Sequence, residues 1–180
     1  MSARLVVTVW QSHAAREEAE TDLVLPPHSA RSLPVLALFG HFTDLSDAYR
    51  FGPLAHRATQ ARLLDPAGAV LAEHWHLAPG WGAAASRGLA EDTGLAVTAC
   101  RALAPDLVLL ELTAQRLALF VHFEVPGWWP DDDHFHLPPG RPRQVRLRRD
   151  VPDEGPTDAE VWQGWIHSLN GDRPTAIPAP

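Results

Sequence analysis

A motif of eight residues occurs twice in the sequence and restricts the fold that the chain can adopt. Residues 73–80 read Glu-His-Trp-His-Leu-Ala-Pro-Gly, and residues 133–140 read Asp-His-Phe-His-Leu-Pro-Pro-Gly. Successive strand side chains point to opposite faces, so each aromatic residue is expected to lie opposite its two flanking histidines. The Pro-Gly pair ends the strand, because proline has no N–H group and glycine accepts a positive φ. The recurrence favours two comparable β modules in tandem, with convergence on one turn chemistry as the alternative.

Further short strands extend this pattern along the chain. The clearest hairpin joins residues 58–64 to 69–77 through the turn Asp-Pro-Ala-Gly. The other strands are expected at 5–10, 20–25, 32–38, 95–103, 107–113, 118–125, 133–137 and 144–148. Short strands at this spacing, with Pro and Gly between them, are typical of antiparallel β-sandwiches. The expected fold class is therefore all-β.

The end of the chain departs from this pattern. Residues 157–160, Thr-Asp-Ala-Glu, have the spacing of a capping box, and apolar residues then recur at helical spacing. A short C-terminal helix is therefore expected at 157–169, with Trp162, Trp165 and Ile166 on its apolar side. Two exposed tryptophans would favour aggregation, so the helix is expected to dock on the chain's own sandwiches or on another chain.

These elements divide the chain into four parts. Residues 1–80 are expected to form the first sandwich and residues 95–150 the second. Residues 81–94, rich in Gly and Ala, are expected to link the two. Residues 151–180 are expected to form a tail that contains the helix.

Composition excludes some classes of protein. Of the 180 residues, 46% are hydrophobic and 21% are charged, which is ordinary for a soluble globular protein. The net charge of −7 argues against binding to nucleic acid, and no apolar run is long enough to span a membrane. The N-terminus lacks the features of a secretory signal, so a cytoplasmic location is expected.

The basic residues are all arginine, and several of them cluster at residues 141–149. Along a strand, Arg146 and Arg148 share one face, and Val145 and Leu147 share the other. This pattern indicates a half-buried strand with a solvated face. An anion-binding site is the alternative.

Paired histidines raise the possibility of a metal site. The candidate ligands are His74, His76, His134 and His136, since such pairs supply metal ligands on some β folds. If the aromatic faces are buried, however, the histidines face water, and strands in separate domains would not bring four imidazoles together. No metal or other cofactor is therefore expected. The run of aspartates at 131–133 is a weaker candidate for calcium, because it lacks the glycine-spaced pattern of a known loop.

Nucleophilic catalysis has no motif in the sequence. There is no Gly-x-Ser-x-Gly elbow and no Gly-rich phosphate loop. The single cysteine, Cys100, excludes an intrachain disulfide and is expected to be buried. Three tryptophans, Trp81, Trp128 and Trp129, fall in predicted loops, where they are candidates for stacking on sugar rings. Packing against a core edge or another domain is the alternative for them.

The second half of the chain resembles a known family. The similarity is to the last immunoglobulin-like domain of beta-mannosidases in glycoside hydrolase family two. It is carried by residues 119–127, Leu-Phe-Val-His-Phe-Glu-Val-Pro-Gly, by the repeated motif at 133–140 and by the strand at 144–147. The hairpin at 63–71 and the strand at 74–79 are similar to the preceding immunoglobulin-like domain. The resemblance implies two tandem immunoglobulin-like antiparallel β-sandwiches, with the short C-terminal helix after them.

What the resemblance implies about function is limited by the length of the chain. The catalytic glutamates of that family lie in a barrel domain upstream of these sandwiches, so no catalytic residue carries over and no catalytic activity is expected in this chain. The implied role is a structural accessory region that packs on the catalytic domain or chain of a glycoside hydrolase. A stand-alone carbohydrate-binding module is the alternative, and a small metal-dependent β-fold enzyme is a third. The first module looks short, so self-association through an unpaired strand edge is also expected.

Overall fold

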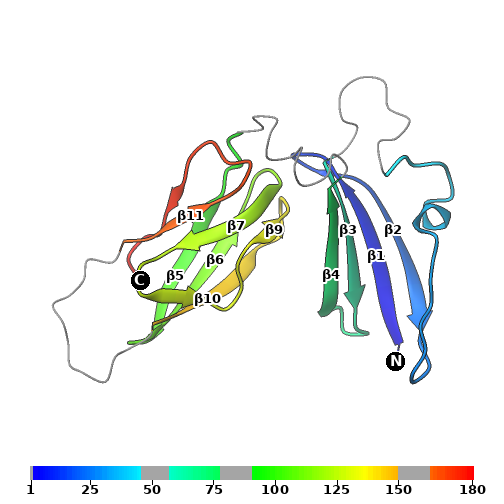
Figure 1. Cartoon of the computed structure of the whole chain (residues 1–180), viewed down its shortest axis with the longest axis horizontal. Helices are drawn as coiled ribbons and strands as arrows, with labels where there is room; N and C mark the ends of the chain where they lie inside the picture. The colour runs from blue at the N-terminus through cyan, green and yellow to red at the C-terminus, as the bar shows by residue number, and fades with distance from the viewer. Residues whose placement is uncertain (1, 46–56, 78–90, 150–162) are drawn as a thin grey trace. The chain divides into compact units, whose positions relative to one another are not determined.

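The structure is a computed structural model that describes residues 2–45, 57–77, 91–149 and 163–180. Its internal contacts divide the chain into two units, Met1–Ala84 and Ala85–Pro180 (Figure 1). In the described ranges both units are built from antiparallel strands, which confirms the all-β prediction. None of the helical segments in these ranges has the length and apolar character needed to cross a bilayer.

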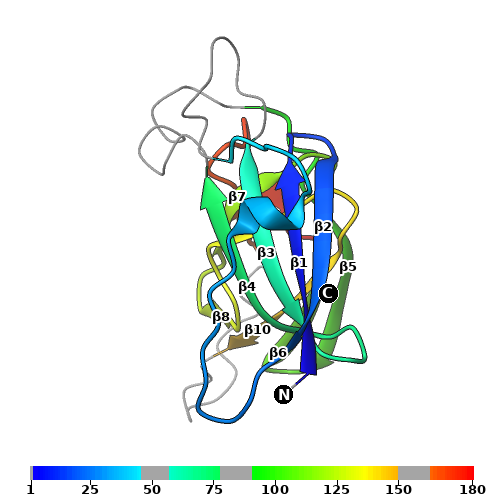
Figure 2. The ribbon, with the colours of Figure 1, turned by 90° about the vertical axis from the view of Figure 1, so that its right-hand side faces the viewer.

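The first unit is a four-stranded antiparallel sheet in the order β2-β1-β3-β4 (Figure 2). Its strands are β1 (Ser2–Trp10), β2 (Ala15–Val24), β3 (Ala58–Leu64) and β4 (Val70–Leu77). The hairpin between β3 and β4 lies where the sequence predicts it. Asp65 closes its turn, because one carboxylate oxygen accepts hydrogen bonds from the backbone N–H groups of Ala67 and Ala69 at 2.9 and 2.8 Å.

The strand predicted at residues 32–38 is wrong. A short 3₁₀ helix, η1 (Val35–Leu38), forms there and contacts β2, and Figure 2 shows it in front of the sheet. Proline fixes the φ of Pro34, and the Pro34 carbonyl accepts a bond of 3.0 Å from the Ala37 N–H group. This local hydrogen bond forms a helical turn, whereas a strand would need hydrogen bonds to a neighbouring strand.

The face of the first sheet that carries Trp10 is buried but polar. The Trp10 indole N–H donates to the Gln60 side chain at 3.1 Å, and the Gln60 amide donates to Glu73 at 3.0 Å. The buried Thr8 hydroxyl donates to Glu18 at 2.6 Å. These hydrogen bonds run across four neighbouring strands and satisfy polar groups that would be costly to bury alone.

The second unit is a sandwich of two antiparallel sheets, with strand orders β5-β6-β10-β8 and β12-β11-β7-β9. The first sheet contains β5 (Ala96–Ala104), β6 (Leu107–Thr113), β10 (Arg143–Arg149) and β8 (Trp128–Pro130). The second contains β12 (Thr175–Ala176), β11 (Trp165–His167), β7 (Ala118–Glu124) and β9 (Phe135–Leu137). Apolar side chains of both sheets form one core, among them Leu110, Val145, Leu147, Val121 and Ile166.

The C-terminal helix predicted at 157–169 is wrong over the part that can be compared. Residues 157–162 lie outside the described ranges, and Trp165–His167 forms strand β11, which pairs with β7 and β12. Ile166 points into the core with 0% of its surface exposed, whereas Trp165 points outward and is 45% exposed. The last segment of the chain therefore completes the second sandwich instead of docking on it as a separate helix.

Asn170 joins this last segment to β7. Its side-chain oxygen accepts a bond of 2.8 Å from the Leu119 N–H group, and its amide donates to the Leu117 carbonyl at 2.9 Å and to Glu91 at 3.1 Å. The Asn170 backbone carbonyl also accepts from the Glu91 N–H group at 2.9 Å. The buried Asn170 side chain thus satisfies backbone groups at the start of β7 that a neighbouring strand would otherwise satisfy.

Candidate functional site on the second sandwich

Strand β7 presents polar side chains on the outer face of its sheet. Val121 and Phe123 point into the core, so the alternation of the strand turns His122 and Glu124 outward. The register between β7 and β11 places His167 directly beside His122. Three ionisable groups therefore share one partly exposed face.

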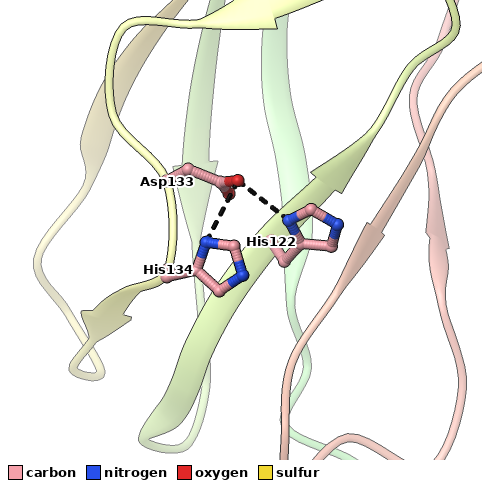
Figure 3. Close-up of side chains that lie close together, drawn as sticks. All are labelled: His122, Asp133 and His134. Carbon is pink, nitrogen blue, oxygen red and sulfur yellow. Dashed lines mark hydrogen bonds and ion pairs between the residues drawn. The ribbon is translucent and has the colours of Figure 1, made fainter.

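The aspartate that precedes β9 closes a cluster with two histidines (Figure 3). One Asp133 carboxylate oxygen lies 2.8 Å from Nδ1 of His122 and 3.2 Å from Nδ1 of His134. The other oxygen accepts the Phe123 backbone N–H group at 3.2 Å, just beyond the residues of β7 that pair with β9. The carboxylate is thus fixed by the strand itself, and both imidazoles are directed at it.

The backbone at His134 sets the position of its ring. Its φ is 57°, in the left-handed region that residues other than glycine seldom adopt. The turn brings the His134 ring to 4.6 Å from the His122 ring, measured between centroids. Sparsely populated backbone conformations of this kind concentrate at functional sites, where the surroundings hold them in place.

His167 belongs to a separate pair on the same face. Its Nε2 lies 3.0 Å from a Glu124 carboxylate oxygen, and its ring centroid is 6.4 Å from that of His122. This pair is a neighbour of the cluster, but in the described structure His167 is directed at Glu124, whereas His122 and His134 are both directed at Asp133.

The predicted histidines separate into three groups. His74 and His76 are exposed on β4, opposite the buried Trp75, as the alternation predicts. The same expectation is wrong for His136, which is buried and whose Nδ1 accepts the Phe120 N–H group at 3.1 Å. That N–H group lies at an irregularity in the β7–β9 ladder, so His136 satisfies a donor that the ladder misses.

Only His134 of the four candidates reaches the cluster, and its partner His122 was missed. His122 lies inside a correctly predicted strand, where its outward position follows from the burial of Val121 and Phe123. Nothing in the spacing of the sequence, however, indicates that residues 131–134 fold back beside that strand.

The three aspartates of the calcium hypothesis have three different sets of partners. Asp131 accepts the Arg146 N–H group at 2.8 Å, Asp132 pairs with Arg143, and Asp133 binds the histidines. The arginine cluster is therefore engaged in part with the acidic turn. Val145 and Leu147 are buried between exposed neighbours, which confirms the predicted alternation of that strand.

The candidate sugar-binding tryptophans differ in exposure. Trp81 lies outside the described residues, and Trp128 packs against the core of the second sandwich. Trp129, the next residue of β8, is 66% exposed. Among the described tryptophans of this set, Trp129 is therefore the more accessible to a ligand.

Cys100 is half-buried on β5 and packs against the core of the second sandwich. Burial disfavours the thiolate and raises the pKa of the Cys100 thiol. Because the thiolate is the nucleophile, we expect iodoacetamide to alkylate Cys100 more slowly in the folded chain than in the chain unfolded in urea at the same pH. Mass spectrometry of timed samples measures both rates. Equal rates would contradict the conclusion that burial raises the pKa of the Cys100 thiol.

Comparison with known proteins supports the fold. No family model and no curated protein matches the chain. The crystal structure of Amycolatopsis orientalis exo-chitosanase CsxA matches 99% of this chain with a TM-score of 0.54 and 11% identity. A structure from a study of the inhibition of the exo-beta-D-glucosaminidase CsxA matches the same share with a TM-score of 0.53 and 12% identity. The chain spans 24% of the length of each of these proteins and shares the fold of the matched part.

Proposed function

We propose that this chain is a non-catalytic accessory region of a glycoside hydrolase of the family-two type, which packs on a catalytic domain or chain. The observation that carries the proposal is the fold match, which includes 99% of this chain but only 24% of a chitosan-degrading enzyme. The resemblance of residues 119–147 to the last domain of beta-mannosidases points to the same class of enzyme. A beta-mannosidase is the more specific form of the proposal.

The first unit offers a surface for association. β2 and β4 are the outer strands of its described sheet, and edge strands pair readily with strands of another chain. Acidic side chains along β2, including Glu17, Glu18 and Glu20, protect that edge. The β4 edge, with the exposed Val70 and Leu71, is therefore the more favourable site for a catalytic chain or a second copy.

The first test is for activity and partner binding together. We expect the purified chain to hydrolyse neither an aryl-β-mannoside nor an aryl-β-glucosaminide. We also expect it to elute as a complex with a family-two catalytic barrel from the same genome whose own C-terminal sandwiches have been removed. Light scattering of the chain alone measures self-association in the same experiment.

Two results would contradict the proposal. The first is turnover that survives repurification and is lost when a carboxylate of this chain is replaced. The second is the absence of any complex with the barrel, together with binding of β-linked oligosaccharides that Trp129→Ala abolishes. That second result would favour the stand-alone carbohydrate-binding module, and Trp165→Ala, which changes another exposed tryptophan, is its matched control.

A further inference from the structure

The cluster of His122, Asp133 and His134 has the donor set of a transition-metal site. Two imidazole nitrogens and a carboxylate oxygen lie within 4.8 Å of one another. Imidazole suits zinc, copper and nickel, and a carboxylate completes many zinc sites that have three protein ligands. We propose that these three side chains bind one divalent first-row transition-metal ion, with Zn²⁺ as its probe.

The distances fit this assignment. A zinc ion holds nitrogen and oxygen ligands at about 2.1 Å, so two donors on a tetrahedral ion lie roughly 3.4 Å apart. One carboxylate oxygen of Asp133 lies 2.8 Å from Nδ1 of His122 and 3.2 Å from Nδ1 of His134. Both distances are shorter than this separation, so the side chains would move apart slightly to admit an ion.

The carboxylate is prepared for this role by its second oxygen. The Phe123 N–H group holds that oxygen at 3.2 Å, which orients the first oxygen between the two imidazoles. Hydrogen bonds that fix a ligating carboxylate in this way are a regular part of metal sites. The positive φ of His134 belongs to the turn that brings the second imidazole to the carboxylate.

The ion is reachable from solvent and would join two segments. The side chains of His122 and His134 are 44% and 62% exposed, and that of Asp133 is 25% exposed. A bound ion would connect β7 to the residues before β9, so binding is expected to stabilise the second sandwich. Three protein ligands leave a coordination position open to water or to an outside ligand.

The test is calorimetric titration of Zn²⁺ into the tag-free, chelator-treated full chain. We expect one ion per chain at this site. Even loss of an outer-shell partner weakens metal binding by roughly 10–100-fold, so His122→Ala and His134→Ala are each expected to weaken it by more than about tenfold. His167→Ala on the same face and His74→Ala on β4 are the matched controls, and both are expected to keep the affinity.

Two further measurements separate the loss of a ligand from the loss of the fold. Circular dichroism melts without metal are expected to be similar for wild type and His134→Ala, because the His134 side chain is largely exposed. Electron paramagnetic resonance of the Cu²⁺-loaded chain is expected to show coupling to two imidazole nitrogens, reduced to one in His134→Gln. Zn²⁺ binding that is absent, or that His122→Ala and His134→Ala leave unchanged, would show that the cluster is only a hydrogen-bonded triad. Loss of binding in His167→Ala equal to that in His134→Ala would overturn the assigned ligand set.

Discussion

Replacing Ile166 by alanine is expected to lower the free energy of unfolding of the second unit by about 2–5 kcal/mol. Ile166 is fully buried in the core of the second unit, to which apolar residues of β7 and β10 also belong. Removal of its branched side chain loses that burial and leaves a cavity that the close-packed core fills only in part. Denaturant unfolding of the full chain, with hydrogen exchange across β7 and β11, measures the loss and locates it.

Trp165→Ala is the matched comparison, since it removes a larger side chain from the neighbouring position. Trp165 is 45% exposed on the outer face, so we expect a loss of roughly 1 kcal/mol. A helix at 157–169 would instead bury Trp165 together with Ile166, and the two variants would then be similarly unstable. A Trp165→Ala loss equal to or greater than that of Ile166→Ala would contradict the strand.

The two residues also show why the end of the chain was misread. A three-residue strand contains only one alternation, and the apolar residues before it recur at helical spacing. The side chain that decides the matter is Ile166, whose burial depends on pairing with a strand about forty residues earlier. Local periodicity does not contain that pairing. Strand β8 was missed for a similar reason. Trp128–Pro130 is three residues long, and its partner β10 follows only after β9, which belongs to the other sheet.

Longer strands were predictable from local pattern alone. β3 and β6 lie where the sequence places them, because turn formers mark one end of each strand, Asp-Pro after β3 and Pro-Asp before β6. The exposure of His74 and His76 follows from the alternation of side chains around a buried tryptophan. In these segments local preference and tertiary structure agree.

The candidate metal site lies beyond such reasoning. The repeated motif predicts that His134 and His136 lie on the same face, but the positive φ at His134 turns the chain before β9 begins at Phe135. His136 is then buried and His134 meets His122. The outward position of His122 on β7 could be predicted from the sequence. Its contact with Asp133 could not, because that contact depends on how the turn at 131–134 folds.

Replacing Asn170 by alanine is expected to cost about 3 kcal/mol of the free energy of unfolding of the second unit. The change removes three hydrogen bonds and leaves the Leu119 N–H group and the Leu117 carbonyl without their partner in a buried region. A buried polar group left unsatisfied costs roughly 1–3 kcal/mol, and two are affected here.

Comparison with other side-chain changes separates this effect from the loss of an amide as such. Gln144→Ala removes an exposed amide whose bond to Glu111 is 3.3 Å long, so it is expected to change stability by less than about 0.5 kcal/mol. Asn170→Asp keeps the acceptor for the Leu119 N–H group but loses both donors and places a second carboxylate beside Glu91. We therefore expect Asn170→Asp to be destabilised as well, because the new carboxylate cannot donate to the Leu117 carbonyl and lies beside the like charge of Glu91. Equal melting temperatures for wild type and Asn170→Ala would show that the amide does not hold the last segment of the chain to β7.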